Sequence, residues 1–292
     1  MESSTSGTIS VVVPTYNSAS VIKDCLDSLG RQSHAPENVV VCDGGSTDDT
    51  VAIATSAGAT VVHADANRSV QRNTGALHAR GEFIVFIDSD MRLSHEVLRD
   101  CVLNFRTSDA ALVIPEKFTG ESYWAKVRGF ERTFYEGVWW LQAARCYRRE
   151  QFIEIGGFDV GLIGPEDWDL DERIRQFGKV REISAVIDHN EGQTNFGKLL
   201  QKKNHYSKSF PEFEIRHPER ATLCLSGRRR VSLFLRRPLN LITHPMLTAG
   251  IVAMGISEIF VVRGWLNFWN SEFLERPMDL AKNPLLNDDQ SN

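Results

Sequence analysis

The sequence lacks an excess of basic residues. Its 292 residues include 33 Lys and Arg against 38 Asp and Glu, which gives a formal net charge of −5. Nucleic acids are polyanions, and a domain that binds them usually carries a surplus of positive charge. We therefore expect no nucleic acid partner.

Cysteines are also few, and none lies close to another. The five cysteines are scattered between Cys25 and Cys224, without the close spacing of zinc or dithiol motifs. This favours buried thiols in a reducing compartment. The polar start of the chain, residues 1–6, has neither the basic residues nor the apolar run of a secretory signal. We therefore expect the folded part of the chain to lie in the cytoplasm.

What the sequence does have is enough apolar content for a sizeable core. Hydrophobic residues make up 42% and charged residues 24%, which excludes a disordered or fibrous protein. Up to residue 114, apolar runs alternate with helical stretches, a pattern typical of an α/β fold with a mostly parallel sheet flanked by helices. We expect strands at Ile9–Val13, Val39–Cys42, Thr60–His63, Phe83–Ile87 and Leu112–Ile114, and helices over residues 21–29, 48–56, 70–79 and 95–105.

The second half of the chain changes character twice. Residues 122–141 are rich in aromatics and predict a helix that lines a groove, and a glycine-rich loop at 156–165 leads into a helix over 168–176. After Gly227 a cluster of arginines precedes an apolar stretch at 239–262. We therefore expect a catalytic domain over residues 1–226 and a basic, hydrophobic helical region over 227–292.

Two acids follow one of the apolar strands. Asp88 and Asp90, one residue apart, come directly after the run that ends at Ile87. Carboxylates at the end of a strand suit Mg²⁺ or Mn²⁺, which prefer oxygen ligands and often take only one or two from the protein. The alternative is that the pair caps the next helix or fills a turn.

Asp43 ends the second predicted strand, Val39–Cys42, so it should face the same crevice as Asp88 and Asp90. Glu166 and Asp167 open a helix, where they either stabilise the helix dipole or, as a base, deprotonate a hydroxyl. His189 follows another apolar run and is either a metal ligand or a structural residue.

Two common nucleotide-binding motifs are missing from the sequence, namely the dinucleotide glycine motif and the phosphate-loop motif. The sequence therefore does not indicate an NAD-dependent enzyme or an ATP-driven motor.

Taken in order, these segments resemble the family 2 glycosyltransferases over about residues 8–215. Six short pieces at family-like spacing carry the resemblance: 11–17 (Val-Val-Val-Pro-Thr-Tyr-Asn), 42–50 (Cys-Asp-Gly-Gly-Ser-Thr-Asp-Asp-Thr), 71–75 (Gln-Arg-Asn-Thr-Gly), 81–90 (ending Asp-Ser-Asp), 156–159 (Gly-Gly-Phe-Asp) and 166–170 (Glu-Asp-Trp-Asp-Leu). The resemblance implies a Rossmann-like GT-A fold. It also implies inverting transfer from a nucleotide-diphosphate sugar.

The resemblance further implies where the nucleotide sugar binds. Pro14 and Tyr16 would flank the nucleobase, and Asn17 belongs to the same binding segment. Asp43 would contact the base or its ribose, and Arg72 would lie near the diphosphate.

The family pattern also implies the reacting groups. Asp88 and Asp90 would hold the diphosphate and a Mn²⁺ or Mg²⁺ cofactor, with His189 as a further metal ligand suggested by its position. Asp167 is the expected catalytic base, with Glu166 as the alternative. A cation can supply several kcal/mol to a leaving diphosphate. A nucleotidyltransferase and a non-catalytic membrane scaffold are the competing functions.

The composition of the C-terminal region indicates where the enzyme would bind its acceptor. An apolar stretch from Met246 to Val262 follows the arginine cluster, and Trp265, Phe268 and Trp269 come after it. This favours an in-plane or re-entrant helix at the cytoplasmic face of a membrane, with a glycan or polyprenyl-linked acceptor. The alternative is a core helix or the interface of a homo-oligomer.

Overall fold

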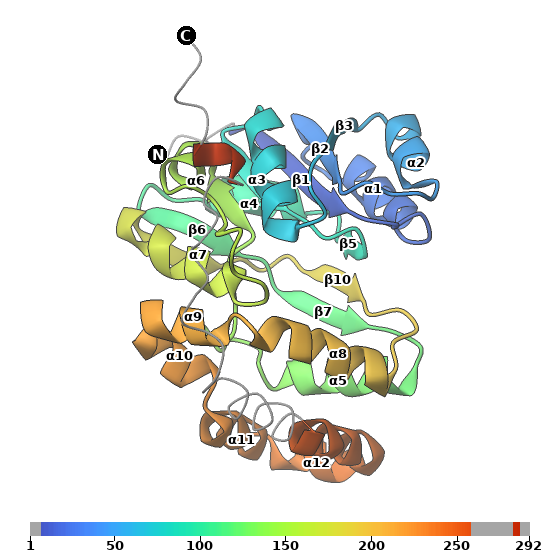
Figure 1. Cartoon of the computed structure of the whole chain (residues 1–292), viewed down its shortest axis with the longest axis vertical. Coiled ribbons are helices and arrows are strands. Elements are labelled where there is room, and N and C mark those ends of the chain that lie inside the picture. The colour runs from blue at the N-terminus through green and yellow to red at the C-terminus, as the bar shows by residue number, and fades with distance from the viewer. Residues whose placement is uncertain (1–6, 258–282, 287–292) are drawn as a thin grey trace.

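Seven strands form the main sheet of the computed structural model, which describes residues 7–257 and 283–286 (Figure 1). Neighbouring strands are parallel except around β8, which runs antiparallel to β4 and β6. The order is β3 (Thr60–His63), β2 (Asn38–Asp43), β1 (Ile9–Thr15), β4 (Phe83–Phe86), β8 (Cys146–Arg148), β6 (Asp109–Val113) and β9 (Lys179–Glu182).

The predicted α/β architecture is confirmed. All five predicted strands are present, although β6 begins at Asp109 rather than at Leu112. Their continuous apolar runs are explained by burial on both faces, because Val11 and Val13 face one hydrophobic cluster and Val12 faces the other. All five cysteines are free and buried, as expected.

Helices cover both faces of this sheet. The face of Val11 and Val13 is covered by α1 (Ile22–Gly30), α2 (Thr50–Ser56) and α4 (Val97–Asn104). The face of Val12 is covered by α3 (Arg68–His78), α6 (Arg149–Glu154) and α7 (Glu166–Ile174), which continues into η1 (Arg175–Phe177). Gly75 lets α3 lie directly on β1, since an added Cβ there would stand 2.3 Å from Val12 Cγ1.

The fold contains a second sheet, which has three strands. Its order is β5 (Met91–Leu93), β10 (Ile187–Asn190) and β7 (Glu116–Thr119), and α5 (Tyr123–Thr133) packs on β7. Trp124 of α5 contacts Phe196 of α8 (Phe196–Ser207), so the two helices lie side by side (Figure 1). The sequence did not predict β5 and β7, because both are short and mix charged with apolar residues.

The C-terminal helices that the structure describes pack on two earlier helices, the first two on α7 and the later ones on α5. They are α9 (Phe210–Arg216), α10 (Pro218–Cys224), α11 (Gly227–Leu235), α12 (Pro238–Thr243) and a helical stretch over residues 245–257. Leu233 of α11 and Met254 share a buried cluster with Val127 and Phe134. The predicted boundary after residue 226 coincides with the start of α11, and the division into domains stays a prediction.

A short segment near the C-terminus returns to the catalytic half. Asn283 is buried and accepts a hydrogen bond from Asn73 of α3, and Leu285 of η3 (Pro284–Leu286) packs in the cluster on the Val12 face. Among the residues described, no helix has the length and apolarity needed to cross a bilayer. The end of the predicted apolar stretch, 258–262, and the three aromatics after it lie outside the described residues.

Candidate functional site

A cavity of about 640 Å³ opens where strands of the main sheet end. Pro14 and Tyr16 line it at the end of β1, and Asp88 and Asp90 line it after β4. The opposite walls come from the second sheet, α5, and the N-terminus of α7 with Asp167. Predicted residues from motifs between positions 14 and 167 therefore meet at one cavity, as expected for an open α/β sheet.

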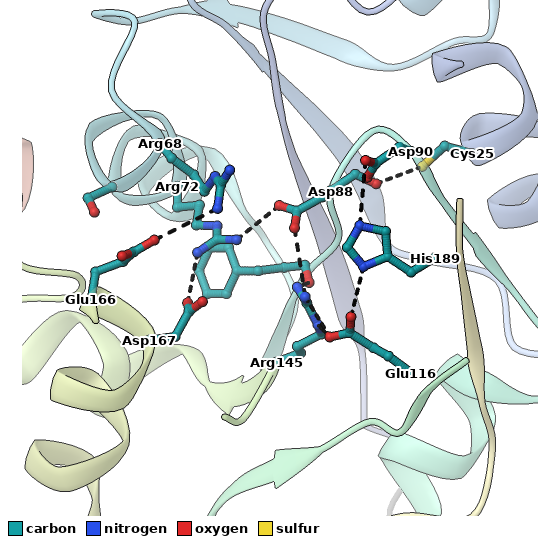
Figure 2. A network of polar contacts seen from close by, with 12 residues as sticks. Cys25, Arg68, Arg72, Asp88, Asp90, Glu116, Arg145, Glu166, Asp167 and His189 are labelled. Atoms are coloured by element: carbon teal, nitrogen blue, oxygen red, sulfur yellow. Dashed lines mark hydrogen bonds and ion pairs between the residues drawn. The ribbon is translucent and has the colours of Figure 1, made fainter. Parts of the chain in front are cut away.

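A buried guanidinium connects two of the predicted acids. The side chain of Arg72 is only 1% exposed, and its Nη2 donates to Asp88 Oδ1 at 2.9 Å while its Nη1 donates to Asp167 Oδ1 at 2.8 Å (Figure 2). Burial by itself raises the pKa of Asp88, but the charges of Arg72 and Arg145 outweigh burial and hold that pKa well below its usual range. Asp88 is therefore ionised at neutral pH.

A second polar network supports Asp90. Arg145, just before β8, binds Glu116 Oε1 at 2.6 Å, and Glu116 Oε2 binds His189 Nδ1 at 2.9 Å. His189 Nε2 lies 3.5 Å from Asp90 Oδ2 (Figure 2). Burial lowers the pKa of His189, but its hydrogen bonds to Asp90 and Glu116 outweigh burial and raise the pKa to about 9. In this arrangement His189 is a cation that orients Asp90.

Asp90 also has the vacant donor oxygen that a cation needs. Its side chain is 39% exposed, yet its Oδ1 is buried without a hydrogen-bond partner. An unpaired buried oxygen is costly unless something charged or polar satisfies it. Within residues 7–257 and 283–286 there is no closed cluster of three or more His, Cys, Asp or Glu. Two carboxylates still fit a hard cation such as Mg²⁺, because this cation often takes only one or two ligands from the protein and the others from substrate phosphate and water.

Glu166 and Asp167 differ in their surroundings at the start of α7. Glu166 is buried and accepts a hydrogen bond from the backbone of Gly164, and burial together with Asp167 raises the pKa of Glu166. Asp167 is 32% exposed and faces the cavity. The neighbouring acids Asp169 and Asp171 are buried in ion pairs with Arg173 and Arg175, so they are structural.

Asp43 and Asn17 hold a loop together and are not part of the cavity wall. The Asp43 carboxylate accepts hydrogen bonds from Thr15 and from the backbone and hydroxyl of Ser46. The Asn17 amide oxygen accepts from the backbone of Thr47. These contacts shape the edge beside Tyr16, which is 58% exposed, and the predicted nucleotide contacts of Asp43 and Asn17 stay predictions.

The sequence did not predict three cavity residues that pair with the predicted ones: Arg68, Glu116 and Arg145. Arg68 lies between Glu166 Oε1, at 3.9 Å, and the Tyr206 hydroxyl, at 3.2 Å. Glu116 follows the apolar run that includes Ile114, so the strand-end rule that identified Asp88 could have found it. No local pattern marks Arg68 or Arg145, because their partners come from distant segments.

Known proteins resemble this chain in sequence and in fold. The model of the family described as "Glycosyl transferase family 2" matches residues 10–161. A glycosyltransferase of PGL/p-HBAD biosynthesis from Mycobacterium bovis is 28% identical over 175 residues, 56% of this chain and 68% of that protein. An O-antigen chain rhamnosyltransferase from Salmonella typhimurium is 26% identical over 211 residues, which are 64% of this chain and 67% of that protein.

Among solved structures, a mannosyltransferase from Pyrobaculum calidifontis in complex with GDP-Man and Mn²⁺ superposes with a TM-score of 0.64. The alignment covers 91% of this chain and 88% of that one, at 18% sequence identity. A likeness at this identity concerns the fold alone.

Proposed function

The chain belongs to glycosyl transferase family 2, and from this premise we propose that it transfers a sugar, with inversion, from a nucleotide-diphosphate sugar. It has the GT-A fold of the family's glycosyltransferases. The acceptor in this proposal is a hydroxyl or phosphate group of a glycan or of a polyprenyl-linked molecule. The observation that carries the proposal is the bridge by Arg72 between Asp88 and Asp167.

On the donor side, the chain's own groups would bind and neutralise the diphosphate. Asp90, through its unpaired Oδ1, and Asp88 would hold Mn²⁺ or Mg²⁺. When bound, such a cation stabilises the negative charge of the departing nucleoside diphosphate. Arg72, held between two carboxylates, would add positive charge beside the leaving group.

On the acceptor side, Asp167 would remove the proton from the attacking hydroxyl. It is exposed to the cavity, and Arg72 fixes its position relative to Asp88. The acceptor oxygen then forms its bond to the anomeric carbon as the bond to the diphosphate breaks. A single displacement of this kind inverts the anomeric configuration, and a positioned carboxylate typically contributes about 10²- to 10⁴-fold to the rate.

The test is a screen of UDP- and GDP-sugars with the full chain, with Mn²⁺ or Mg²⁺ and with excess chelator. The proposal expects metal-dependent release of nucleoside diphosphate and no pyrophosphate. Release of pyrophosphate would instead support the nucleotidyltransferase alternative. Absence of turnover with every donor and acceptor, in a protein that still binds nucleoside diphosphate, would favour the non-catalytic scaffold.

The C-terminal helices support a second part of the proposal, which is docking to the cytoplasmic face of a membrane. Apolar side chains of this region are more than half exposed, namely Val231, Leu235, Leu239, Ile242 and Met246. Exposed arginines lie beside them, at Arg228, Arg229, Arg236 and Arg237. Apolar and basic side chains together suit an anionic lipid surface, on which the helices would lie in the plane.

Vesicle sedimentation tests this docking. The full chain should bind vesicles that contain anionic lipid more strongly than neutral ones, and Leu239→Ser with Ile242→Ser should weaken binding. Ser257→Ala, which removes a hydroxyl that donates to the backbone carbonyl of Ala253 in its own helix, serves as the control. Vesicle binding by the double variant equal to that of the unchanged protein would refute the membrane surface. If the unchanged protein were a dimer and the double variant a monomer, this face would instead join two copies of the chain.

A further inference from the structure

Arg132 of α5 is a cation of the cavity wall. Within the part of the chain that the structure describes, its guanidinium takes part in no ion pair and no hydrogen bond, and its Nε is buried without a partner. Arg132 as a whole is half-buried, and even partial removal of an unpaired charge from water costs free energy. A guanidinium kept in this state on a cavity wall therefore points to a ligand that pairs with it.

Most other cations of the cavity already have acidic partners, whereas Lys202 lies over the ring of Tyr206. Arg128, one turn earlier on α5, lies beside Glu131 and Glu191. Glu131 Oε1 also accepts a hydrogen bond from the Tyr135 hydroxyl, at 2.7 Å. Arg145 is paired with Glu116 and Asp88, His189 with Glu116 and Asp90, and Arg68 lies near Glu166.

The charge balance around Arg132 favours an incoming anion. Burial and the charge of Arg128 both lower the pKa of Arg132, and together they outweigh the opposite effect of the nearby acids Glu131 and Glu116. An anionic group bound at Arg132 would offset both the burial and the repulsion from Arg128.

Aromatic rings hold the Arg132 guanidinium in place. Its central carbon lies 5.0 Å from the centre of the Phe118 ring and 5.9 Å from that of Tyr135. Gly129 makes this possible, because an added Cβ there would stand 2.9 Å from the Phe118 carbonyl oxygen and push α5 away from β7. A guanidinium stacked on rings keeps its edge free, and that edge matches two oxygens of a phosphate.

Arg132 reaches the cavity from a different element than the predicted diphosphate groups. The predicted diphosphate groups lie after β4 and on α3, whereas Arg132 comes from α5, which Figure 1 shows below the main sheet with β7 between. We propose that Arg132 binds a phosphate group of the acceptor, at the wall of the cavity formed by α5 and β7. This inference rests on the proposed function, in which a sugar is transferred to an acceptor that binds in this cavity.

The experiment compares phosphate probes with their neutral alcohols in the presence of Mn²⁺ and nucleoside diphosphate. Glycerol phosphate against glycerol tests a soluble acceptor, and farnesyl phosphate against farnesol in phosphatidylcholine vesicles tests a lipid one. The full chain should bind one of the phosphates at least tenfold more tightly than its alcohol. Arg132→Gln should lose this preference and Arg132→Lys should keep part of it, because Lys retains the charge without the fork.

Lys126→Gln is the matched control, since Lys126 lies exposed on the same helix and does not line the cavity. Its preference should equal that of the unchanged protein. Should Arg132→Gln fail to fold, Arg132→Lys decides, and wild-type affinity in that variant would overturn the inference.

The inference is also overturned if the unchanged protein shows no preference for either phosphate, or if Arg132→Gln retains the full preference. Displacement of the probe by nucleoside diphosphate would assign Arg132 to the donor site and overturn it too. The donor screen separates the two proposals. If the unchanged protein turns over none of the donors, the proposed function is refuted, while binding of the phosphate probes still decides the role of Arg132.

Discussion

Arg72 Nη1 lies 2.8 Å from Asp167 Oδ1, although 95 positions separate the two residues in the sequence. The same guanidinium holds Asp88 through Nη2. One buried side chain of α3 therefore fixes the distance between the acid expected beside the metal and the acid expected to act as base. Neither acid can shift without breaking a charged hydrogen bond.

Arg72→Lys should impair turnover more than folding. Lysine keeps the positive charge but cannot bind two carboxylates with a planar fork. We expect kcat to fall by about 10²-fold, because loss of alignment at the reacting centre has this order of effect. Steady-state kinetics with the donor found in the screen is the measurement. Arg80→Lys, exposed just beyond α3, is the control, and equal rates for the two variants would contradict a bridging role for Arg72.

Asp167→Asn should separate binding from chemistry. The amide keeps the shape of the side chain and loses its basicity, so donor affinity should survive while turnover falls by roughly two to four orders of magnitude. Glu166→Gln is the informative partner, because Glu166 is buried against the Gly164 backbone. If Glu166→Gln lost turnover to that extent and Asp167→Asn did not, Glu166 would be the base.

The central strands and their helices could be predicted from the sequence because their signal is local. Apolar runs such as Ile9–Val13 are continuous since both faces of the sheet are covered. Strands β5 and β7 could not be predicted, because their pairing depends on β10, which is distant in the sequence. Short strands with charged residues resemble loops until a partner is known.

In the site, too, local features could be predicted from the sequence and contacts between distant segments could not. Strand-end acids such as Asp88 could be predicted from position alone, whereas the contact between two of the recognised motifs could not. Asn73 donates to the Phe158 carbonyl and accepts from the Phe158 backbone N–H, which joins the motif of Arg72 to the Gly-Gly-Phe-Asp loop. Arg132 gave no signal, because its lack of a partner is visible only once every neighbour is placed.

Asp90→Ala should abolish metal-dependent binding of nucleoside diphosphate. Asp90 carries the buried oxygen that lacks a partner, so its removal deletes the proposed cation ligand while leaving the bridge between Arg72 and Asp88 intact. Calorimetric titration of nucleoside diphosphate with and without Mn²⁺ is the measurement. Asp188→Asn, exposed on β10 beside His189, should behave as the unchanged protein. Full activity of Asp90→Ala in excess chelator would refute the metal site.

Acid should destabilise the fold partly through Glu131. Burial by itself raises the pKa of Glu131, but the charges of Arg128, Lys203 and Arg132 outweigh burial and lower the pKa to about 2, from an ordinary value of 4.5. Because the folded pKa is the lower one, ionised Glu131 stabilises the fold above pH 4.5, and this contribution is lost as the pH falls from about 4.5 to about 2. By pH 3 the loss should be on the order of 2 kcal/mol.

Urea denaturation at pH 7 and pH 3 measures this loss. Other carboxylates titrate equally in the unchanged protein and in Glu131→Gln, so the difference between their two pH-induced drops isolates Glu131. The drop in the free energy of unfolding should be smaller in Glu131→Gln by the amount given above, even where the variant is less stable at pH 7 because Arg128 has lost its partner. Glu214→Gln, an exposed acid of α9, should show the full drop. Equal drops in all three proteins would mean that the charges around Glu131 do not stabilise its ionised form.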